Sequence, residues 1–270
     1  MSTLSMIGRA RTPGAQRPAW VGGLVGIASV LVVWTVLAST VVSERQGVPT
    51  PWAVLVQLGS DGWTFFSPHL QQTGWEAVRG YVGGNLAALA VAILILLVPQ
   101  IERVAMQLAV ASYCLPILAI GPIFTVALTG SAPQAALAGL AVFFTTVVGA
   151  LLGLRSADAT SLDLVRAYGG GRWQQLRRVR FTAALPATFA ALQMAAPAAL
   201  LGAIIGEYLG GVDRGLGVAM VVAEQALEVD RTWGIALVAG AVAGIAYALI
   251  GLVARLVTPW ARATTAGGGA

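Results

Sequence analysis

The sequence predicts an all-α membrane protein with six transmembrane helices. Of its 270 residues, 57% are hydrophobic and 10% are charged, whereas soluble domains carry about 25% charged residues. The mean hydropathy is +0.81. Long runs without any charged residue reach or exceed the roughly 20 residues that a helix needs to cross a bilayer, and these runs place the predicted helices.

The N-terminal part is predicted to contain a tail, one membrane span and a loop. Residues 1–20 carry three arginines and form a cytoplasmic tail, and residues 21–43 are charge-free and long enough to span the membrane. A signal peptide is the alternative, but this run exceeds the usual apolar core of a signal and lacks a convincing cleavage site. Residues 44–75 contain prolines, glycines and three tryptophans, which predicts an extracytoplasmic loop with interfacial aromatic anchors.

The remaining spans are predicted within a membrane core that covers residues 76–260. Residues 104–154 contain no ionisable side chain, and as a single helix they would be about 75 Å long, far more than a bilayer. The chain must therefore fold back, and the sequence Thr-Gly-Ser-Ala-Pro at 129–133 is the predicted turn between spans three and four. The five spans of this core are placed at residues 80–101, 104–154 (two spans), 181–206 and 232–254. Residues 261–270 are predicted to form a disordered tail.

The distribution of arginine predicts the orientation. All 16 basic residues are Arg. With six spans and a cytoplasmic N-terminus, twelve of them lie inside and four outside, which is the expected positive-inside bias. We therefore expect a multi-pass protein of the bacterial plasma membrane with both termini cytoplasmic. The net charge of +5 then reflects topology and contact with membrane lipid, and no nucleic-acid partner is expected.

The residues that are missing exclude several kinds of chemistry. Without Lys the chain has neither a Walker-type phosphate loop nor a Schiff-base amine. One Cys and one His exclude an internal disulfide and a Cys/His zinc cluster. We expect no catalytic residue, no metal and no cofactor in this chain. No predicted span carries an ionisable residue, which counts against proton-driven carriers and pumps, so the energy for active transport would come from a partner.

The polar segment 155–182, between the fourth and fifth spans, carries the most informative pattern. Asp158 or Ser161 can cap a short helix, and three glycines at 169–171 end it. The apolar edge of this helix is predicted at Leu162, Val165 and Tyr168. Composition and spacing leave two readings open: a positive-inside loop that lies on lipid headgroups, or a short helix that docks into a groove of another protein.

The same segment resembles the cytoplasmic signature of binding-protein-dependent ABC transporter permeases. The common form of that signature reads Glu-Ala-Ala, then a Gly, then an apolar residue followed by Leu-Pro. Here Asp163-Leu164-Val165 occupies the Glu-Ala-Ala positions, Gly169 the Gly and Leu185-Pro186 the Leu-Pro. Asp in place of Glu and two larger residues in place of Ala are departures from the pattern.

Two further stretches extend the resemblance over about residues 75–260. LPILAIGPIFTVALTG is similar to the family's Pro-rich segment in span three. IIGEYLGGVDRGLGVAM is similar to its external Glu-x-x-Gly and Gly-Leu-Gly loop. These segments look most like the nitrate/sulfonate/taurine branch, which also holds importers of pyrimidine-type vitamin precursors.

The resemblance implies the type I ABC importer permease fold and a set of partners. These are a dimer of ABC ATPase subunits that bind the ATP, a second identical or related permease copy, and an extracytoplasmic solute-binding protein. The chain would form the path for a small solute, such as a sulfonate, nitrate, taurine or a vitamin precursor. The resemblance implies that residues 162–168 form a coupling helix, which would insert into a cleft of the ATPase. The coupling residues implied are Leu162, Asp163, Leu164, Val165, Arg166, Ala167, Tyr168, Gly169, Leu185 and Pro186.

Four residues are candidates for the translocation path. Asn85 is explained as well by an interhelical hydrogen bond as by contact with substrate. Pro116 and Pro122 each remove a helix hydrogen bond and predict a kink near the pore, with a simple packing kink as the alternative. Glu207 could face the pore mouth or the binding protein, but we expect a solvated carboxylate at the end of a helix.

Two other classes of function are weighed against the importer permease. An ion-coupled secondary transporter is opposed by the charge-free spans, although carbonyl oxygens alone can coordinate sodium. A membrane enzyme or assembly factor is opposed by the lack of an acid–base or metal cluster.

Overall fold

The computed structural model describes residues 19–41 and 47–262 and contains no strand in these ranges. The chain divides after Leu55 into two compact units. Most of the predicted N-terminal tail, and the predicted C-terminal tail beyond Arg262, lie outside the described residues. The α-helices are α1 Ala19–Val36, α2 Pro51–Leu97, α3 Glu102–Cys114, α4 Ile117–Ala127, α5 Ala132–Arg155, α6 Ala159–Ala167, α7 Arg172–Gln175, α8 Phe181–Tyr208, α9 Leu216–Gln225 and α10 Val229–Val257.

The first unit holds α1 and the beginning of α2. A π-helical turn, Leu37–Val41, continues α1. The indole Nε1 of Trp34 donates a hydrogen bond to the carbonyl oxygen of Pro49 at 2.9 Å. The hydroxyl of Thr50 accepts from the backbone N–H of Ala53 at 3.3 Å, which caps the start of α2. These two bonds tie α1 and the start of α2 together within the unit.

The segment predicted as a loop is helical instead. α2 runs from Pro51 to Leu97, and only Gly62 has a non-helical conformation inside it (φ 62°, ψ −176°). The prolines and glycines that suggested a loop therefore mark the start of the helix, a break at Gly62 and a tolerated Pro68. Its location outside the membrane stays a prediction.

The predicted third span is broken rather than kinked. α3 and α4 are bent by 97° to one another, and the break lies at Leu115 and Pro116, both of which have extended backbone. Pro116 cannot donate an N–H and disfavours helix in the residue before it. Pro122 lies inside α4 without ending it. Only Pro116 causes the change in direction.

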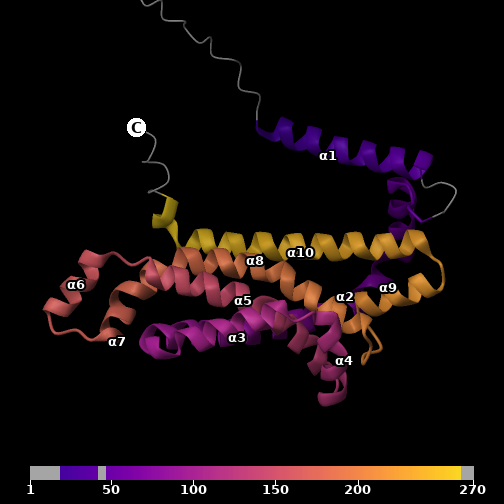
Figure 1. Ribbon diagram of the computed structural model, residues 1–270. Coiled ribbons are helices and arrows are strands. Elements are labelled where there is room, and N and C mark those ends of the chain that lie inside the picture. Colours follow the sequence, from indigo (N-terminus) through magenta and orange to yellow (C-terminus); the bar gives the residue numbers. More distant parts are fainter. Residues whose placement is uncertain (1–18, 42–46, 263–270) are drawn as a thin grey trace, which may run out of the picture. The chain divides into compact units, whose positions relative to one another are not determined.

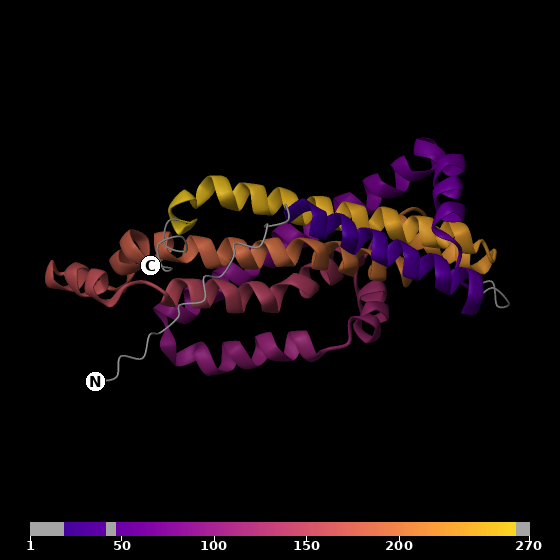
Figure 2. The same ribbon diagram turned by 90° about the horizontal axis from the view of Figure 1, so that it is seen from above.

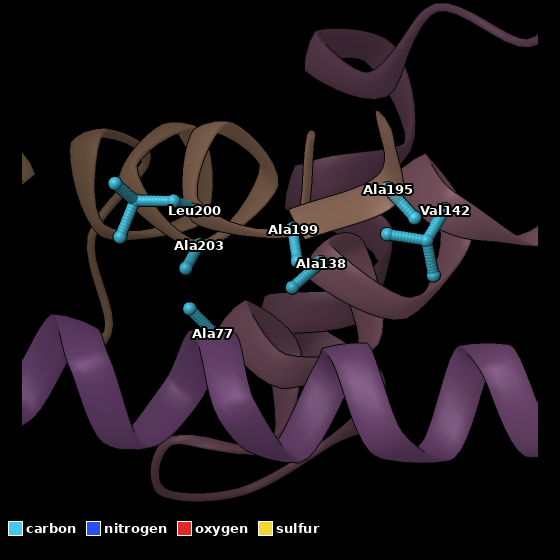
Figure 3. Close-up of a cluster of buried hydrophobic side chains, with 7 residues drawn as sticks. All are labelled: Ala77, Ala138, Val142, Ala195, Ala199, Leu200 and Ala203. Carbon is cyan, nitrogen blue, oxygen red and sulfur yellow. The ribbon is translucent and has the colours of Figure 1, made fainter. Parts of the chain in front are cut away.

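The core is formed where α5 packs against α8, with α10 along the other side of α8 (Figure 1, Figure 2). α5 follows the predicted turn and ends at Arg155, and α8 begins at Phe181 as predicted and ends just beyond the predicted limit. One buried cluster joins α2, α5 and α8 and consists largely of alanine (Figure 3): Ala77, Ala138, Val142, Ala195, Ala199, Leu200 and Ala203.

Glycines set how closely these helices approach. A Cβ added at Gly84 of α2 would lie 2.5 Å from the carbonyl oxygen of Gly139 on α5. A Cβ added at Gly202 of α8 would lie 2.8 Å from the Cα of Ala138. The hydrophobic effect does not drive helices together inside the hydrocarbon of a bilayer. Small residues such as these instead permit the close van der Waals contact that holds membrane helices together.

The lengths and composition of the helices assign the chain to the membrane proteins. In the part of the chain that is described, five helices are long and apolar enough to cross a membrane, or up to six if the bent pair α3–α4 counts as one span. An α-helix satisfies its backbone hydrogen-bonding groups internally, as the hydrocarbon core of a membrane requires. The predicted all-α, multi-pass membrane fold is therefore confirmed.

The packing of α2 on α5 yields a prediction with an adjacent control. Gly84→Ala should destabilise the protein by about 1–3 kcal/mol, because the added methyl group overpacks the contact with Gly139. Gly83→Ala should leave stability unchanged or raise it, since a Cβ there meets nothing within 4 Å. Thermal unfolding of the purified protein in detergent compares the two, and equal midpoints would disprove this account of the contact.

Candidate functional site

The helix α6 lies in the predicted coupling segment, at one end of the bundle formed by α5 and α8 (Figure 1). Asp158 caps it: Oδ2 accepts from the backbone N–H of Ser161 at 2.9 Å and from its hydroxyl at 3.1 Å. These hydrogen bonds lower the pKa of Asp158. The carboxylate cap is thus retained as the pH falls through the ordinary range of Asp and is lost only below it.

A Schellman motif ends α6 at Gly169. The N–H of Gly169 donates to the carbonyl of Arg166, and the N–H of Gly170 donates to that of Val165, both at 2.8 Å. Gly169 has φ +78°, a left-handed conformation that other residues adopt at a cost. The Gly of the family signature therefore has a physical role here, which is to stop the helix abruptly.

The exposed apolar edge of α6 differs from the predicted one. Leu162 is buried, whereas Leu164 is 59% and Tyr168 87% exposed. Together with the exposed Ala167, these two side chains follow the i, i+3, i+4 spacing of one helix face. Asp163 and Arg166 form an exposed ion pair at 2.7 Å beside it. Leu162 anchors the helix, and Leu164, Ala167 and Tyr168 are free for a partner.

Two arginines connect this segment to the membrane helices. Arg172 Nη1 donates to the carbonyl oxygen of Leu97, at the end of α2, at 3.1 Å. Arg180 Nη1 donates to that of Leu154, near the end of α5, at 2.9 Å. Helix-terminal carbonyls have no partner within their own helix, so the arginines supply one. A displacement of α6 and α7 would thereby act on the ends of α2 and α5.

The Leu-Pro of the signature belongs to a different element. Leu185 and Pro186 lie in the second turn of α8 and are half-buried. Pro186 stays inside the helix. The structure thus places Asp163 to Ala167 on α6, with Tyr168 and Gly169 at its C-terminal end, and places Leu185 and Pro186 on α8.

Glu207 is not solvated, and the expectation of an exposed carboxylate is wrong. Its side chain is 1% exposed, near the end of α8. Oε1 accepts from the Thr73 hydroxyl at 2.6 Å, and Oε2 accepts from the backbone N–H of Gly217 at 2.7 Å. Glu76, one turn beyond Thr73 on α2, is also buried and receives a hydrogen bond from Gln72 at 2.6 Å.

These side chains cap the buried start of α9, which lies at the opposite end of the bundle from α6 (Figure 1). The first N–H groups of a helix have no intrahelical acceptor. Here Leu216 N donates to the Thr73 hydroxyl at 2.8 Å, and Gly215 N donates to His69 Nδ1 at 3.1 Å. With the bond from Gly217 to Glu207, side chains of α2 and α8 satisfy three successive donors. The Glu-x-x-Gly and Gly-Leu-Gly stretches are thus two halves of one cap.

Asn85 forms an interhelical hydrogen bond. Its Oδ1 accepts from the hydroxyl of Thr146 on α5 at 2.5 Å, and its Nδ2 donates to the carbonyl of Tyr81 at 2.7 Å. Asn85 is 4% exposed, so the bond to Thr146 accounts for its polarity. Asn85 and Glu207 belong to separate polar clusters.

The sequence analysis did not predict the roles of several residues at these sites. Thr73 and His69 lie in the segment predicted to be a loop, and Glu76 directly follows it. Only recognition of α2 as a helix could have placed Thr73 and Glu76 on one face. Arg172 and Arg180 lie in the polar segment 155–182, and no contact with the ends of α2 and α5 was predicted for them, although Arg at the junction of a polar segment and a span is a signal for carbonyl capping. Leu164 was named only through the family resemblance, because the apolar edge predicted from spacing consisted of Leu162, Val165 and Tyr168.

The end of α6 gives a prediction about local stability. Gly169→Ala should speed hydrogen exchange at the amides of residues 169 and 170, because a left-handed alanine costs about 1 kcal/mol and weakens the Schellman bonds. Gly171→Ala is the control, since Gly171 has extended backbone and open space around it. Equal protection in the two variants would refute the role assigned to Gly169.

The cap of α9 gives a second prediction. Thr73→Val should destabilise the protein by about 1–3 kcal/mol, because Leu216 N–H and Glu207 both lose a buried partner. Thr73→Ser keeps the hydroxyl and should restore most of the stability. Thermal unfolding measures both variants, and a valine variant as stable as the serine variant would contradict the capping assignment.

Comparison with known proteins gives the family. Residues 80–263 match the family described as binding-protein-dependent transport system inner membrane component. A probable ABC transporter permease protein of Haemophilus influenzae is 30% identical over 208 residues, which are 77% of this chain and 83% of that protein.

Two further relatives have named substrates. A formylaminopyrimidine transport permease protein of Halalkalibacterium halodurans is 27% identical over 69% of this chain and 74% of its own length. A putative aliphatic sulfonates transport permease protein of Bacillus subtilis is 24% identical over 93% of this chain and 91% of its own length. The matched family region includes α5, α6 with its caps, and the α8–α9 connection. The chain therefore belongs to the family of binding-protein-dependent ABC transporter permeases.

Proposed function

We propose that this chain forms the translocation path of an ATP-driven importer for a small organic solute and receives the work of ATP hydrolysis through α6. The observation that carries the proposal is the exposed apolar face of α6. A helix capped at both ends, with a large aromatic side chain 87% exposed, fits the docking of a short helix into a groove.

The connections of α6 support the mechanism. The partner ATPase would bind Leu164, Ala167 and Tyr168, while buried Leu162 fixes the helix to its own chain. Movement of α6 would pass through Arg172 to α2 and through Arg180 to α5. These helices belong to the tightly packed core, so they would move as units and alternate access to the path.

The partners and orientation complete the proposal. Membership of the family implies a separate ATPase and a solute-binding protein. We place both termini and α6 on the cytoplasmic side, as the arginine distribution predicts, and α9 with its cap on the outer side. Two permease copies would enclose the path. The named relatives suggest a sulfonate-like or pyrimidine-type vitamin-precursor solute.

The exposed tyrosine tests the coupling. In the purified permease–ATPase complex, Tyr168→Ala should lower ATP hydrolysis stimulated by loaded binding protein by about tenfold, because an aromatic anchor in an interface contributes roughly 1–3 kcal/mol. Tyr247→Ala is the control, since Tyr247 is an exposed tyrosine of α10. Unchanged stimulation in Tyr168→Ala, with the complex intact, would remove the coupling assignment.

A further inference from the structure

A hollow of about 300 Å³ lies beside the coupling segment. It is formed where the end of α2 meets α6, α7 and the turn before α8. Its lining consists of Leu96, Pro99, Arg166, Arg172, Gln175 and Arg180. Three of these six residues are arginines, and none is acidic. The hollow is therefore strongly cationic.

The three arginines keep donors that the protein does not use. Arg172 and Arg180 each donate one Nη1 bond to a helix-terminal carbonyl, whereas a guanidinium has five N–H donors. Arg166 pairs with Asp163 at 2.7 Å, and this pair is exposed to solvent. Two neighbouring guanidinium groups of the hollow, those of Arg172 and Arg180, have no carboxylate within ion-pair distance in the described ranges.

Gln175 adds a side-chain amide to the lining of the hollow. The residue as a whole is 6% exposed, but its amide is not among the fully buried groups that lack a partner in residues 19–41 and 47–262. The amide therefore opens into the hollow, where its N–H groups can donate to whatever binds there.

We propose that this hollow binds a phosphate group, and that the phosphate is the headgroup of an anionic phospholipid. Guanidinium groups bind phosphate with paired, charge-assisted hydrogen bonds. The lipid source is favoured by Leu96, in the last turn of the candidate membrane span α2, and by Pro99 just beyond it, because they bring the hollow to the depth of the headgroups. Basic pockets at the cytoplasmic ends of membrane helices hold anionic headgroups in this way.

The bound phosphate would join three elements. Arg166 belongs to the coupling helix, Arg172 begins α7, and Arg180 immediately precedes α8. A phosphate between them removes their mutual repulsion and fixes α6 to the ends of α2 and α5. This inference rests on the proposed function only for placing the hollow at the cytoplasmic leaflet.

An added charge tests the site without removing any arginine. In the purified permease–ATPase complex without nucleotide, Gln175→Glu should weaken binding of phosphatidylglycerol by about tenfold, because the new carboxylate takes the arginine donors. Gln174→Glu is the matched control: it adds the same charge to the same helix at an exposed position outside the hollow. Native mass spectrometry counts retained lipid after reconstitution in mixed phosphatidylglycerol and phosphatidylcholine.

A parallel arm identifies the source of the phosphate. Retention of phosphatidylglycerol by the wild type and its loss in Gln175→Glu support the lipid site. Phosphate ions that stabilise the wild type but not Gln175→Glu, without lipid retention, would leave the phosphate site standing and overturn the lipid assignment. Equal lipid binding by Gln175→Glu and Gln174→Glu would overturn the site altogether. Tyr168→Ala should bind lipid normally, so failure of the coupling proposal is distinguishable from failure of this one.

Discussion

The close approach of α5 to α2 and α8 is the contact on which the rest of the structure depends. Lipid tails are as apolar as the side chains, so the hydrophobic effect does not drive helices together within a bilayer. The helices associate instead through dense van der Waals contact and hydrogen bonds. Gly84 against Gly139 and Gly202 against Ala138 permit that contact, and the bond from Thr146 to Asn85 adds a polar link. A core built this way leaves little free space between its helices.

At both ends of this core, polar side chains form hydrogen bonds with the backbone groups of helix termini, and each set of bonds connects separate helices. At one end, Glu207, Thr73 and His69 receive the first N–H groups of α9. At the other, Arg172 and Arg180 satisfy the last carbonyls of α2 and α5. In each case the free backbone groups of a helix end are satisfied by another element. Movement at one cap therefore changes how whole helices are held.

The sequence allowed α5, α8 and α10 to be placed closely, because charge-free runs and a Thr-Gly-Ser-Ala-Pro turn reflect local constraints that act within each element. Gly169 was also identifiable, since a helix stop depends on its own backbone. What could not be seen depends on tertiary contacts. Residues 44–75 look like a loop by composition, yet Thr73 is buried and hydrogen-bonded to the end of α8 and the start of α9, and Glu76 just beyond this range is buried as well.

The same reason explains the errors over Glu207 and Pro116. A carboxylate at a helix end is usually solvated, and only the neighbouring α9, whose N–H groups need acceptors, makes burial of Glu207 favourable. Pro116 was expected to kink a span, but an extended residue before it turns the chain by 97°. Leu162 and Leu164 differ only in the direction of their side chains: Leu162 is buried and Leu164 is exposed. The helix α6 is too short for the spacing of apolar residues to distinguish its buried face from its exposed face.

In the proposed mechanism, a partner ATPase drives the chain through the outer face of α6. A photoreactive group attached at a single cysteine tests this most directly. The chain has one cysteine, Cys114, so Leu164→Cys in a Cys114→Ser background gives one attachment point on that face. In the assembled transporter, illumination should join residue 164 to the ATPase subunit, whereas the same group at Tyr247→Cys should not reach it. Adducts of residue 164 with lipid alone, or with the solute-binding protein, would contradict the account.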